Sequence, residues 1–141
     1  MGFDEEINCG HAALLQHSVQ CRASTSLSAD RVVGGDLATR WASEWFDPQW
    51  IQVDLGEPYN LNCIVLQWEA SYGTACQIQT LSNGKDWVTL FSTNTGDGGI
   101  DYVSVSGSGR YVRMYGTQRV DFSGSGYTYS LYEFEVYGTH P

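Results

Sequence analysis

Short segments with the two-residue alternation of β-strands follow one another along this chain, and turn residues separate them roughly every 8–12 residues. Residues 50–55 alternate between apolar and polar side chains. Residues 61–68 place Ile64, Leu66 and Trp68 on one face. No segment of adequate length has helical periodicity. The pattern predicts an all-β sandwich or barrel.

The length of 141 residues suits one domain with one core. We expect residues 1–9 to be an N-terminal tail and residues 10–139 to be the folded module. Residues 24–40 are rich in Ser, Gly and Asp and are expected to form a loop, and the Asn-Gly pair at 83–84 predicts a hairpin. The expected strands lie in a first region at 12–24 and at 50–55, 61–68, 76–80, 87–91, 101–105, 111–115 and 132–137.

The formal net charge is −9, from 7 basic and 16 acidic residues. Such a surface repels phosphate backbones and anionic lipid head groups, so we expect no nucleic acid partner and disfavour a membrane. No apolar run approaches the ~20 residues that a transmembrane helix needs.

Sequence signals of catalysis are absent. The three histidines lie near the termini, and no phosphate-binding loop, metal-hydrolase motif or nucleotide fingerprint occurs. Glycosidase chemistry needs two carboxylates that face one cleft, an arrangement that only a structure can test. We therefore predict a binding domain rather than an enzyme.

The four cysteines form an even set whose spacings match no zinc pattern. Cys76 shares a strand face with Ile78, and we expect that face to be buried. Cys63 lies on the face of its strand opposite Ile64. A Cys63–Cys76 disulfide is therefore disfavoured, Cys21 is expected to face the core, and the disulfide state stays open.

The run from Gly35 to Gly56 joins a polar, turn-rich loop to the alternating segment at 50–55. The loop carries Arg40 and Trp45. A planar cation and an aromatic ring on a loop that is anchored to a sheet form a recognition surface on a rigid scaffold.

Five runs occur in a consistent order between about residues 12 and 138: DLATRW, DPQWIQVDLG, LQWEASYGTACQIQTLSNGKDW, GRYVRMYGT and YSLYEFEVYG. Together they resemble a discoidin domain, also called the coagulation factor 5/8 type C domain. Within that superfamily the chain is most similar to family 32 of the carbohydrate-binding modules, which are often appended to bacterial glycoside hydrolases. The resemblance implies an eight-stranded jelly-roll β-sandwich of the galactose-binding-domain-like type. It also implies a secreted, extracellular protein with a sugar site on the loops at one end and one structural calcium ion.

Arg40 and Glu69 are the first candidates for sugar contact. Arginine offers a rigid fork of hydrogen-bond donors, and a carboxylate accepts two hydroxyl hydrogens. The resemblance implies that the loops carrying these two residues meet at the binding end. The alternative is a structural salt bridge beneath the loops.

Trp45 and Tyr127 are the candidate stacking residues, because the C–H faces of sugars pack on aromatic rings and exposed aromatic area is costly. Glu44 is a weaker third contact from the first loop. Tyr127 lies on the last long loop, where related modules often carry an aromatic residue that touches the ligand. The alternative for both rings is loop packing.

The other tryptophans are predicted to belong to the core. Trp41, Trp50 and Trp68 lie on or beside apolar strand faces. Tyr129, at the start of the last strand, is predicted to be structural as well. Recognition would then fall to the aromatic residues of the loops.

The family's calcium loop typically begins Asp-Gly-Asp/Asn and ends Thr-Arg-Trp, and a late Glu closes the site. The matching oxygen donors here are Asp36, Thr39 and Glu133, which suit Ca²⁺. Gly34 replaces the first Asp, which removes one charged ligand. The resemblance implies a structural ion that pins the loop carrying Arg40. The alternative is that Glu133 accepts hydrogen bonds from loop amides.

The resemblance implies a non-catalytic module that binds oligosaccharide or polysaccharide and targets an appended glycoside hydrolase of the same parent chain. The ligand stays open among galactosides, amino sugars or chitosan, and β-glucans. The acidic surface suits cationic chitosan, but residues 24–28 lack an acid that some chitosan-binding relatives place there, and Asp30 is the nearest. The alternative functions are a cell-adhesion or phospholipid-binding discoidin domain and a stand-alone, oligomeric lectin.

Overall fold

The protein is described by a computed structural model that covers residues 13–15, 20–24, 32, 40–82, 84–121 and 127–141. This part of the chain forms an antiparallel sheet of eight strands, which confirms the predicted all-β fold. It contains no helix that is long and apolar enough to cross a membrane. The strands are β1 (Ala13–Leu14), β2 (Gln20–Ala23), β3 (Trp41–Ala42), β4 (Gln49–Trp68), β5 (Gly73–Leu81), β6 (Trp87–Thr93), β7 (Ile100–Arg119) and β8 (Ser130–Thr139).

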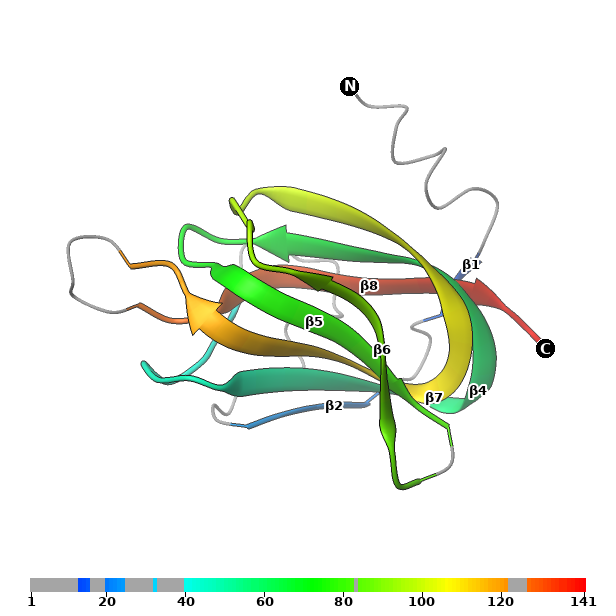
Figure 1. The fold of residues 1–141 in the computed structure, drawn as a ribbon. Coiled ribbons are helices and arrows are strands. Elements are labelled where there is room, and N and C mark those ends of the chain that lie inside the picture. The colour runs from blue at the N-terminus through cyan, green and yellow to red at the C-terminus, as the bar shows by residue number, and fades with distance from the viewer. Residues whose placement is uncertain (1–12, 16–19, 25–31, 33–39, 83, 122–126) are drawn as a thin grey trace.

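β4 and β7 are each 20 residues long, and they pair with each other along both of their halves. The pairing shifts register between Asp54 and Tyr59, where Gly56 adopts a φ of 89°. Both strands curve around one side of the molecule (Figure 1), so their two halves lie in opposite layers. The sequence predicted separate strands at 50–55 and 61–68, and again at 101–105 and 111–115. In the structure each of these two sets forms one continuous strand, because the pairing of β4 with β7 resumes after the bend.

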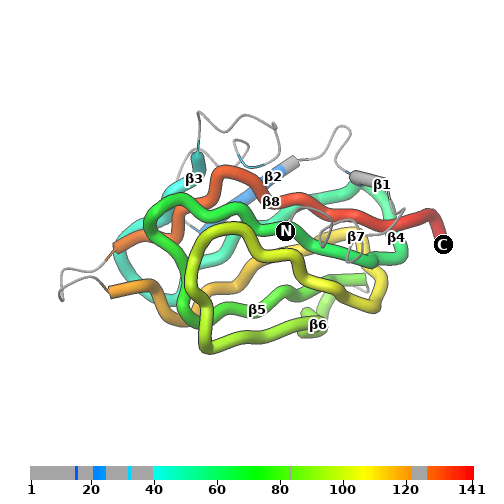
Figure 2. The backbone as a smooth tube through the Cα atoms, turned by 90° about the horizontal axis from the view of Figure 1, so that it is seen from above, coloured from blue at the N-terminus to red at the C-terminus, as the bar shows by residue number. Residues whose placement is uncertain are grey.

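The curved strands connect two layers into a sandwich, as predicted. The first layer contains β2, residues 49–54 of β4, residues 111–116 of β7, β5 and β6. The second layer contains β1, β8 and the other halves of β4 and β7, with β3 paired to the start of β8. Seen from above (Figure 2), β6 lies along one side of the molecule and β2 and β3 lie toward the other.

The core lies between the two layers and is built by strand alternation. Every second residue of β4 and of β7 is buried in the first layer, as Ile51, Val53, Val112 and Met114 show. The second layer contributes its own alternate set. The principal core side chains are Ile51, Val53, Ile64, Leu66, Ile78, Val103, Val112, Met114, Leu131, Phe134 and Val136.

The tryptophans divide differently from the sequence prediction. Trp41 and Trp68 are buried, and Tyr129 is fully buried, as predicted. Trp50 was wrongly predicted to be a core residue, because it is only half-buried. Its neighbour Ile51 faces the core, and alternation therefore turns Trp50 to the outer face of the first layer.

The cysteines also separate. Cys63 is disulfide-bonded, and its partner lies outside the described residues. Cys76 is a free, buried thiol, so the expectation that these two are not bridged is confirmed. Burial raises the pKa of Cys76 to about 12, which leaves it as an unreactive thiol. Cys21 is not in a disulfide and packs against the core, as expected.

Candidate functional site

An ion pair joins two loops at one end of the sandwich. Arg40 directly precedes β3, and Glu69 directly follows β4. The Nη1 atom of Arg40 donates to Oε1 of Glu69 at 2.8 Å, with 48% and 22% of the two side chains exposed. The two loops meet because both flank the start of β8: Trp41 pairs with Leu131, and the amide of Glu69 donates to the carbonyl of Ser130. The loops that carry Arg40 and Glu69 therefore meet, as predicted, and the two side chains form a salt bridge, which is the contact named above as the alternative to sugar binding.

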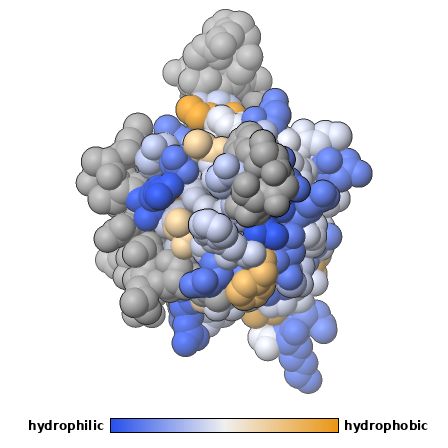
Figure 3. Space-filling view, turned by 90° about the vertical axis from the view of Figure 1, so that its left-hand side faces the viewer, coloured by the Kyte–Doolittle hydropathy of each residue, from blue (hydrophilic) through white to orange (hydrophobic). Residues whose placement is uncertain are grey.

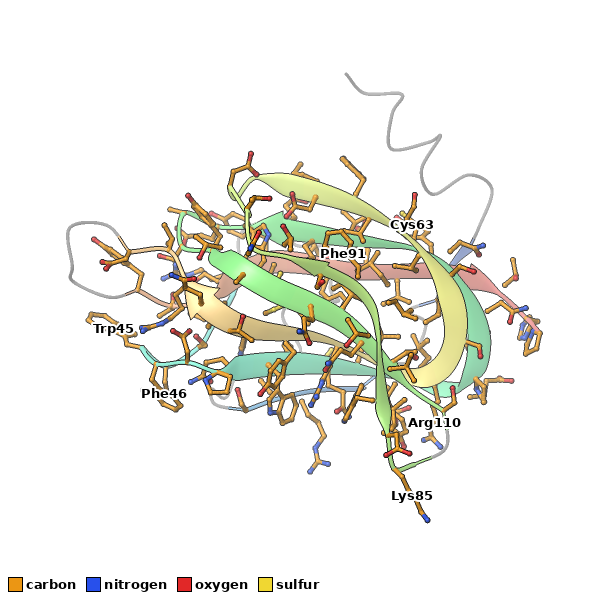
Figure 4. All side chains as sticks on the ribbon, in the orientation of Figure 1. Trp45, Phe46, Cys63, Lys85, Phe91 and Arg110 are labelled. Atoms are coloured by element: carbon orange, nitrogen blue, oxygen red, sulfur yellow. The ribbon has the colours of Figure 1, made fainter. Side chains whose placement is uncertain are left out.

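The segment that follows β3 carries exposed aromatic side chains. Trp45 is 66% exposed and Phe46 is 51% exposed, and both project from the loop end of the sandwich (Figure 4). The segment is held at its base by Ser43, whose amide donates to the carbonyl of Tyr129 and whose Oγ accepts from the amide of Tyr129, each at 2.9 Å. Glu44 is exposed beside Trp45. This arrangement leaves the ring of Trp45 exposed, outside the core.

Asp47 connects this segment to the last long loop. It accepts from the Nε atom of Arg119 at 3.1 Å and from the hydroxyl of the buried Tyr129. The Nη1 atom of Arg119 donates to the carbonyl of Tyr127 at 2.9 Å, so the backbone beside Tyr127 is tied to the loop of Trp45. Burial and the hydrogen bond to Asp47 raise the pKa of Tyr129, which therefore stays a neutral donor.

The close approach of Tyr129 to the sheet requires a residue without a side chain. Gly116 lies beneath the ring of Tyr129, and a Cβ at this position would collide with the ring carbons. The ring is thereby seated so that its hydroxyl reaches Asp47. Asp47 and Arg119 were not among the residues predicted from the sequence. Their only signal was a charge placed at each edge of a loop, which is too common to be informative.

The end of the sandwich that carries these loops faces the viewer in Figure 3, where hydrophilic surface dominates and small hydrophobic areas interrupt it. Of the five predicted sugar contacts, Arg40 and Glu69 touch each other. The segment that carries Trp45 is joined to the backbone of Tyr127 through Asp47 and Arg119. Tyr127 itself is half-buried. The surface offers a carboxylate, guanidinium donors and an exposed ring, which together suit a polyhydroxylated ligand.

The predicted metal ligands are described only in part. Asp36 and Thr39 lie outside the described residues. Glu133 lies on β8 and is only 4% exposed. No cluster of three metal-binding side chains occurs within the described ranges.

A separate cavity of about 290 Å³ opens between β6 and the first half of β7. Its lining includes Leu66, Cys76 and two carboxylates, Asp97 and Asp101. The Nε1 atom of Trp68 donates to Asp101 at 3.0 Å. Burial, and to a lesser degree the neighbouring Asp97, raises the pKa of Asp101. Asp101 is thus a carboxylate with a structural hydrogen bond at the edge of the core.

The F5/8 type C domain family matches residues 16–134 of this chain. The chain is an F5/8 type C domain. Two solved structures are similar to this domain over most of its length, and both are modules of a chitosanase/glucanase from Paenibacillus sp. IK-5. A selenomethionine-labelled variant of its chitosan-binding module 1 is 42% identical with a TM-score of 0.82, and the comparison covers 91% of this chain and 100% of that one.

Chitosan-binding module 2 of the same enzyme, solved with chitotriose, is 38% identical to the domain with a TM-score of 0.79. That comparison covers 88% of this chain and 99% of the module. Among curated proteins, the domain is similar to polysaccharide lyase 8 family protein HylA of Enterococcus faecalis, at 36% identity over 70 residues. The match takes in 50% of this chain and 5% of the length of that relative. These similarities confirm the predicted family and the β-sandwich fold.

Proposed function

We propose that this F5/8 type C domain is a non-catalytic carbohydrate-binding module that binds chitosan-like amino sugars through the loop end of the sandwich. The observation that carries the proposal is the carboxylate of Glu69, which Arg40 holds in place at the loop end that also carries the exposed ring of Trp45. A glucosamine unit is recognised by a carboxylate, which binds its protonated amine, and by an aromatic ring, which stacks on its C–H face.

The net charge and the sequence similarity to solved modules support an amino sugar as the ligand. The net charge of −9 attracts a polycation, and Glu44 adds an exposed carboxylate beside Trp45. The solved modules at 42% and 38% identity are named as chitosan-binding modules. Residues 24–28 lack the acid that some chitosan-binding relatives carry there. In this proposal Glu69 supplies the carboxylate instead.

We also propose that the domain belongs to a longer, secreted chain with a polysaccharide-degrading catalytic domain. The relatives with which it aligns are parts of a chitosanase/glucanase and of a much longer polysaccharide lyase family protein. The disulfide at Cys63 supports an oxidising, extracellular compartment. The module would then raise the local concentration of the catalytic domain at its polymer.

A structural calcium ion remains part of the proposal. Glu133 supplies a hard carboxylate oxygen of the kind that calcium prefers. Asp36 and Thr39 would supply the other side-chain ligands. The ion, when bound, would fix the loop that leads into Arg40 and would supply no chemistry to the ligand.

Calorimetric titration tests the proposal. Fully deacetylated chitosan oligosaccharides should bind better than N-acetylated oligosaccharides of the same length or a β-galactoside. The affinity should fall as the pH rises through the pKa of the sugar amine, because the Glu69 interaction needs the protonated amine. Equal affinity for the acetylated oligosaccharide, or tight binding only to phosphatidylserine vesicles, would contradict it.

A further inference from the structure

The outer face of the first layer carries three rows of side chains that run across the strands. The register pairs Arg22 with Gln52, Gln52 with Arg113, and Arg113 with Gln79. We call these four residues the arginine row. Their neighbours along the strands, such as Val112 and Met114, face the core. The arginine row therefore lies on the solvent side of the sheet.

The guanidinium of Arg113 is held flat on this face. Its Nε atom donates to Oε1 of Gln79 at 2.7 Å. Its central carbon lies 4.0 Å from the ring centroid of Trp87 and 4.7 Å from that of Tyr115. Within the described residues, its two terminal nitrogens have no hydrogen-bond or ion-pair partner. The charge is fixed in orientation and its terminal N–H donors are available.

Arg22 is the second cation of the row. It is exposed, and the described part of the chain gives it no acidic partner. β2 and β7 both pair with β4, so the backbones at Arg22 and Arg113 are about 10 Å apart, two strand spacings. Two uncompensated guanidiniums on one row are unexpected in a chain with 16 acidic and 7 basic residues.

The one acidic residue of the three rows is already neutralised. Asp54 accepts from Nε and Nη2 of Arg110 at 2.7 and 3.1 Å. This hydrogen bonding holds the pKa of Asp54 below its usual range, so Asp54 stays ionised and paired with Arg110. Arg40 and Arg119, near the loop end, are likewise paired with carboxylates. The face is locally positive on an acidic protein.

Aromatic rings flank the arginine row on both sides. Trp50 and Tyr115 are register partners in the row on one side, and Tyr111 and Trp87 both pair with Leu81 in the row on the other side. All four rings are half-buried, so each keeps part of its surface exposed. Rows on the same face are about 7 Å apart. In Figure 4, Trp45 and Arg110, whose guanidinium lies over the ring of Tyr111, are toward opposite ends of the molecule.

We propose that this outer face is a second glycan-binding surface and that its occupant is a polysaccharide chain bearing carboxylates. The half-exposed rings supply stacking surfaces for sugar C–H faces, Gln52 supplies an amide for hydroxyl groups, and the two arginines supply bidentate donors for carboxylates. Gln79 is buried and serves instead to orient Arg113. The face is thus complementary to a ligand of the charge opposite to the amino sugar proposed for the loop end.

Other anionic partners fit this face less well. A nucleic acid duplex carries one charge per about 1.7 Å, so the net charge of −9 opposes it more strongly than it opposes a sparsely charged glycan. A membrane surface favours apolar residues that protrude from loops, whereas this face is an open sheet with its rings partly covered. The observations therefore favour the glycan.

Affinity electrophoresis and calorimetry with polygalacturonate test the proposal, with fully methyl-esterified polygalacturonate as the uncharged match. Wild type should bind the acidic polymer at low ionic strength and should bind the ester at least about tenfold more weakly. Arg22→Gln and Arg113→Gln should each weaken binding of the acidic polymer by about tenfold, and Arg22→Lys should restore part of it. Lys85→Gln, at the β5–β6 hairpin, is the charge-matched control and should bind as wild type.

Thermal unfolding of each variant separates binding from folding. If Arg113→Gln fails to fold, the comparison of Arg22→Gln with Arg22→Lys decides, since Arg22 is exposed and has no hydrogen bond or ion pair with the described residues. Wild type that binds neither polymer, or both equally, overturns the proposal. The proposal is also overturned if polygalacturonate binding is lost in a Trp45→Ala/Glu69→Ala double variant but kept in the arginine variants. Binding to duplex DNA or phosphatidylserine vesicles that depends on the arginines, without binding to polygalacturonate, overturns it as well. Chitosan oligosaccharide titrations of the same variants report on the loop end independently.

Discussion

Arg40 and Glu69 lie 29 residues apart in the sequence and are joined by a 2.8 Å hydrogen bond between Nη1 and Oε1. Glu69 also accepts, at 3.4 Å, from the amide of Ser71. The pair is partly exposed, so its net contribution to folding is small. The pair instead orients Glu69. The guanidinium of Arg40 and the amide of Ser71 both donate to its Oε1 atom and so hold the carboxylate in place at the loop end of the sandwich.

Removal of either partner should therefore cost more in binding than in stability. Arg40→Ala and Glu69→Ala should each weaken chitosan oligosaccharide binding by about 1–3 kcal/mol, because each leaves a sugar group or its partner unpaired. The free energy of unfolding should fall by less than about 1 kcal/mol. Calorimetric titration and urea unfolding of the same samples measure both quantities. Unchanged affinity in both folded variants would show that the site lies elsewhere.

Trp45→Ala should weaken binding by about 1–2 kcal/mol through loss of a stacking surface. The melting temperature should stay the same, because the side chain is 66% exposed and packs little. Val88→Ala is the matched control, since Val88 is 55% exposed on β6 and outside the proposed sites. Quenching of tryptophan fluorescence on titration provides a second measurement. A Trp45 variant with wild-type affinity would assign this ring to another partner.

Asp101→Asn should raise the stability of the domain at neutral pH. Burial raises the folded-state pKa of Asp101 above its ordinary value of 3.8, so ionisation opposes folding once the pH exceeds that value. Asparagine removes the charge and keeps an oxygen that can accept from Nε1 of Trp68. The rise in melting temperature should be less than about 4 °C.

The pH dependence provides the check. In scanning calorimetry the difference between wild type and Asp101→Asn should vanish as the pH falls below 3.8, where the unfolded chain also becomes protonated. Asp97→Asn should show a smaller effect of the same sign, because Asp97 is the lesser cause of the shift. A variant that is less stable at every pH would mean that the charged hydrogen bond to Trp68 outweighs desolvation.

Reduction of the disulfide at Cys63 should destabilise the domain by about 2–4 kcal/mol. A melting temperature measured with and without a reductant tests this, and Cys63→Ser should not respond to the reductant. Cys76 should remain unmodified by a thiol reagent until the domain unfolds, because it is buried and its pKa is raised to about 12. Rapid labelling of Cys76 in the native protein would be inconsistent with this structure.

Calcium addition after chelation should raise the melting temperature, because an ion that binds only the folded state stabilises it by mass action. Magnesium at the same concentration should have a smaller effect, since it prefers a more rigid octahedral site. Gly34→Asp restores the charged ligand that the family pattern carries and should tighten calcium binding. Asp36→Asn should weaken it. A melting temperature that ignores calcium in wild type and in Gly34→Asp would remove the metal from the proposal.

The sequence pattern predicted local structure correctly where it depended on strand alternation or on a turn dipeptide. Alternation in residues 50–55 predicted the burial of Ile51 and Val53, and the Asn-Gly pair predicted the hairpin in which Gly84 adopts a φ of 79°. The same alternation contradicted the core assignment of Trp50, whose size suggested burial although its position faced outward. Side-chain size thus misled where the two-residue period was the better evidence.

The sequence by itself determined the alternation and the turns, which predicted an all-β sandwich or barrel, and its motifs carried the resemblance to the F5/8 type C family. Only the tertiary structure decided which of those residues meet. The pairing of β3 and of β4 with β8 brings Arg40 to Glu69, and the register across β2, β4 and β7 places Arg22 and Arg113 on one row. Contacts between distant residues depend on register and layer packing, which a periodic pattern in one segment does not encode.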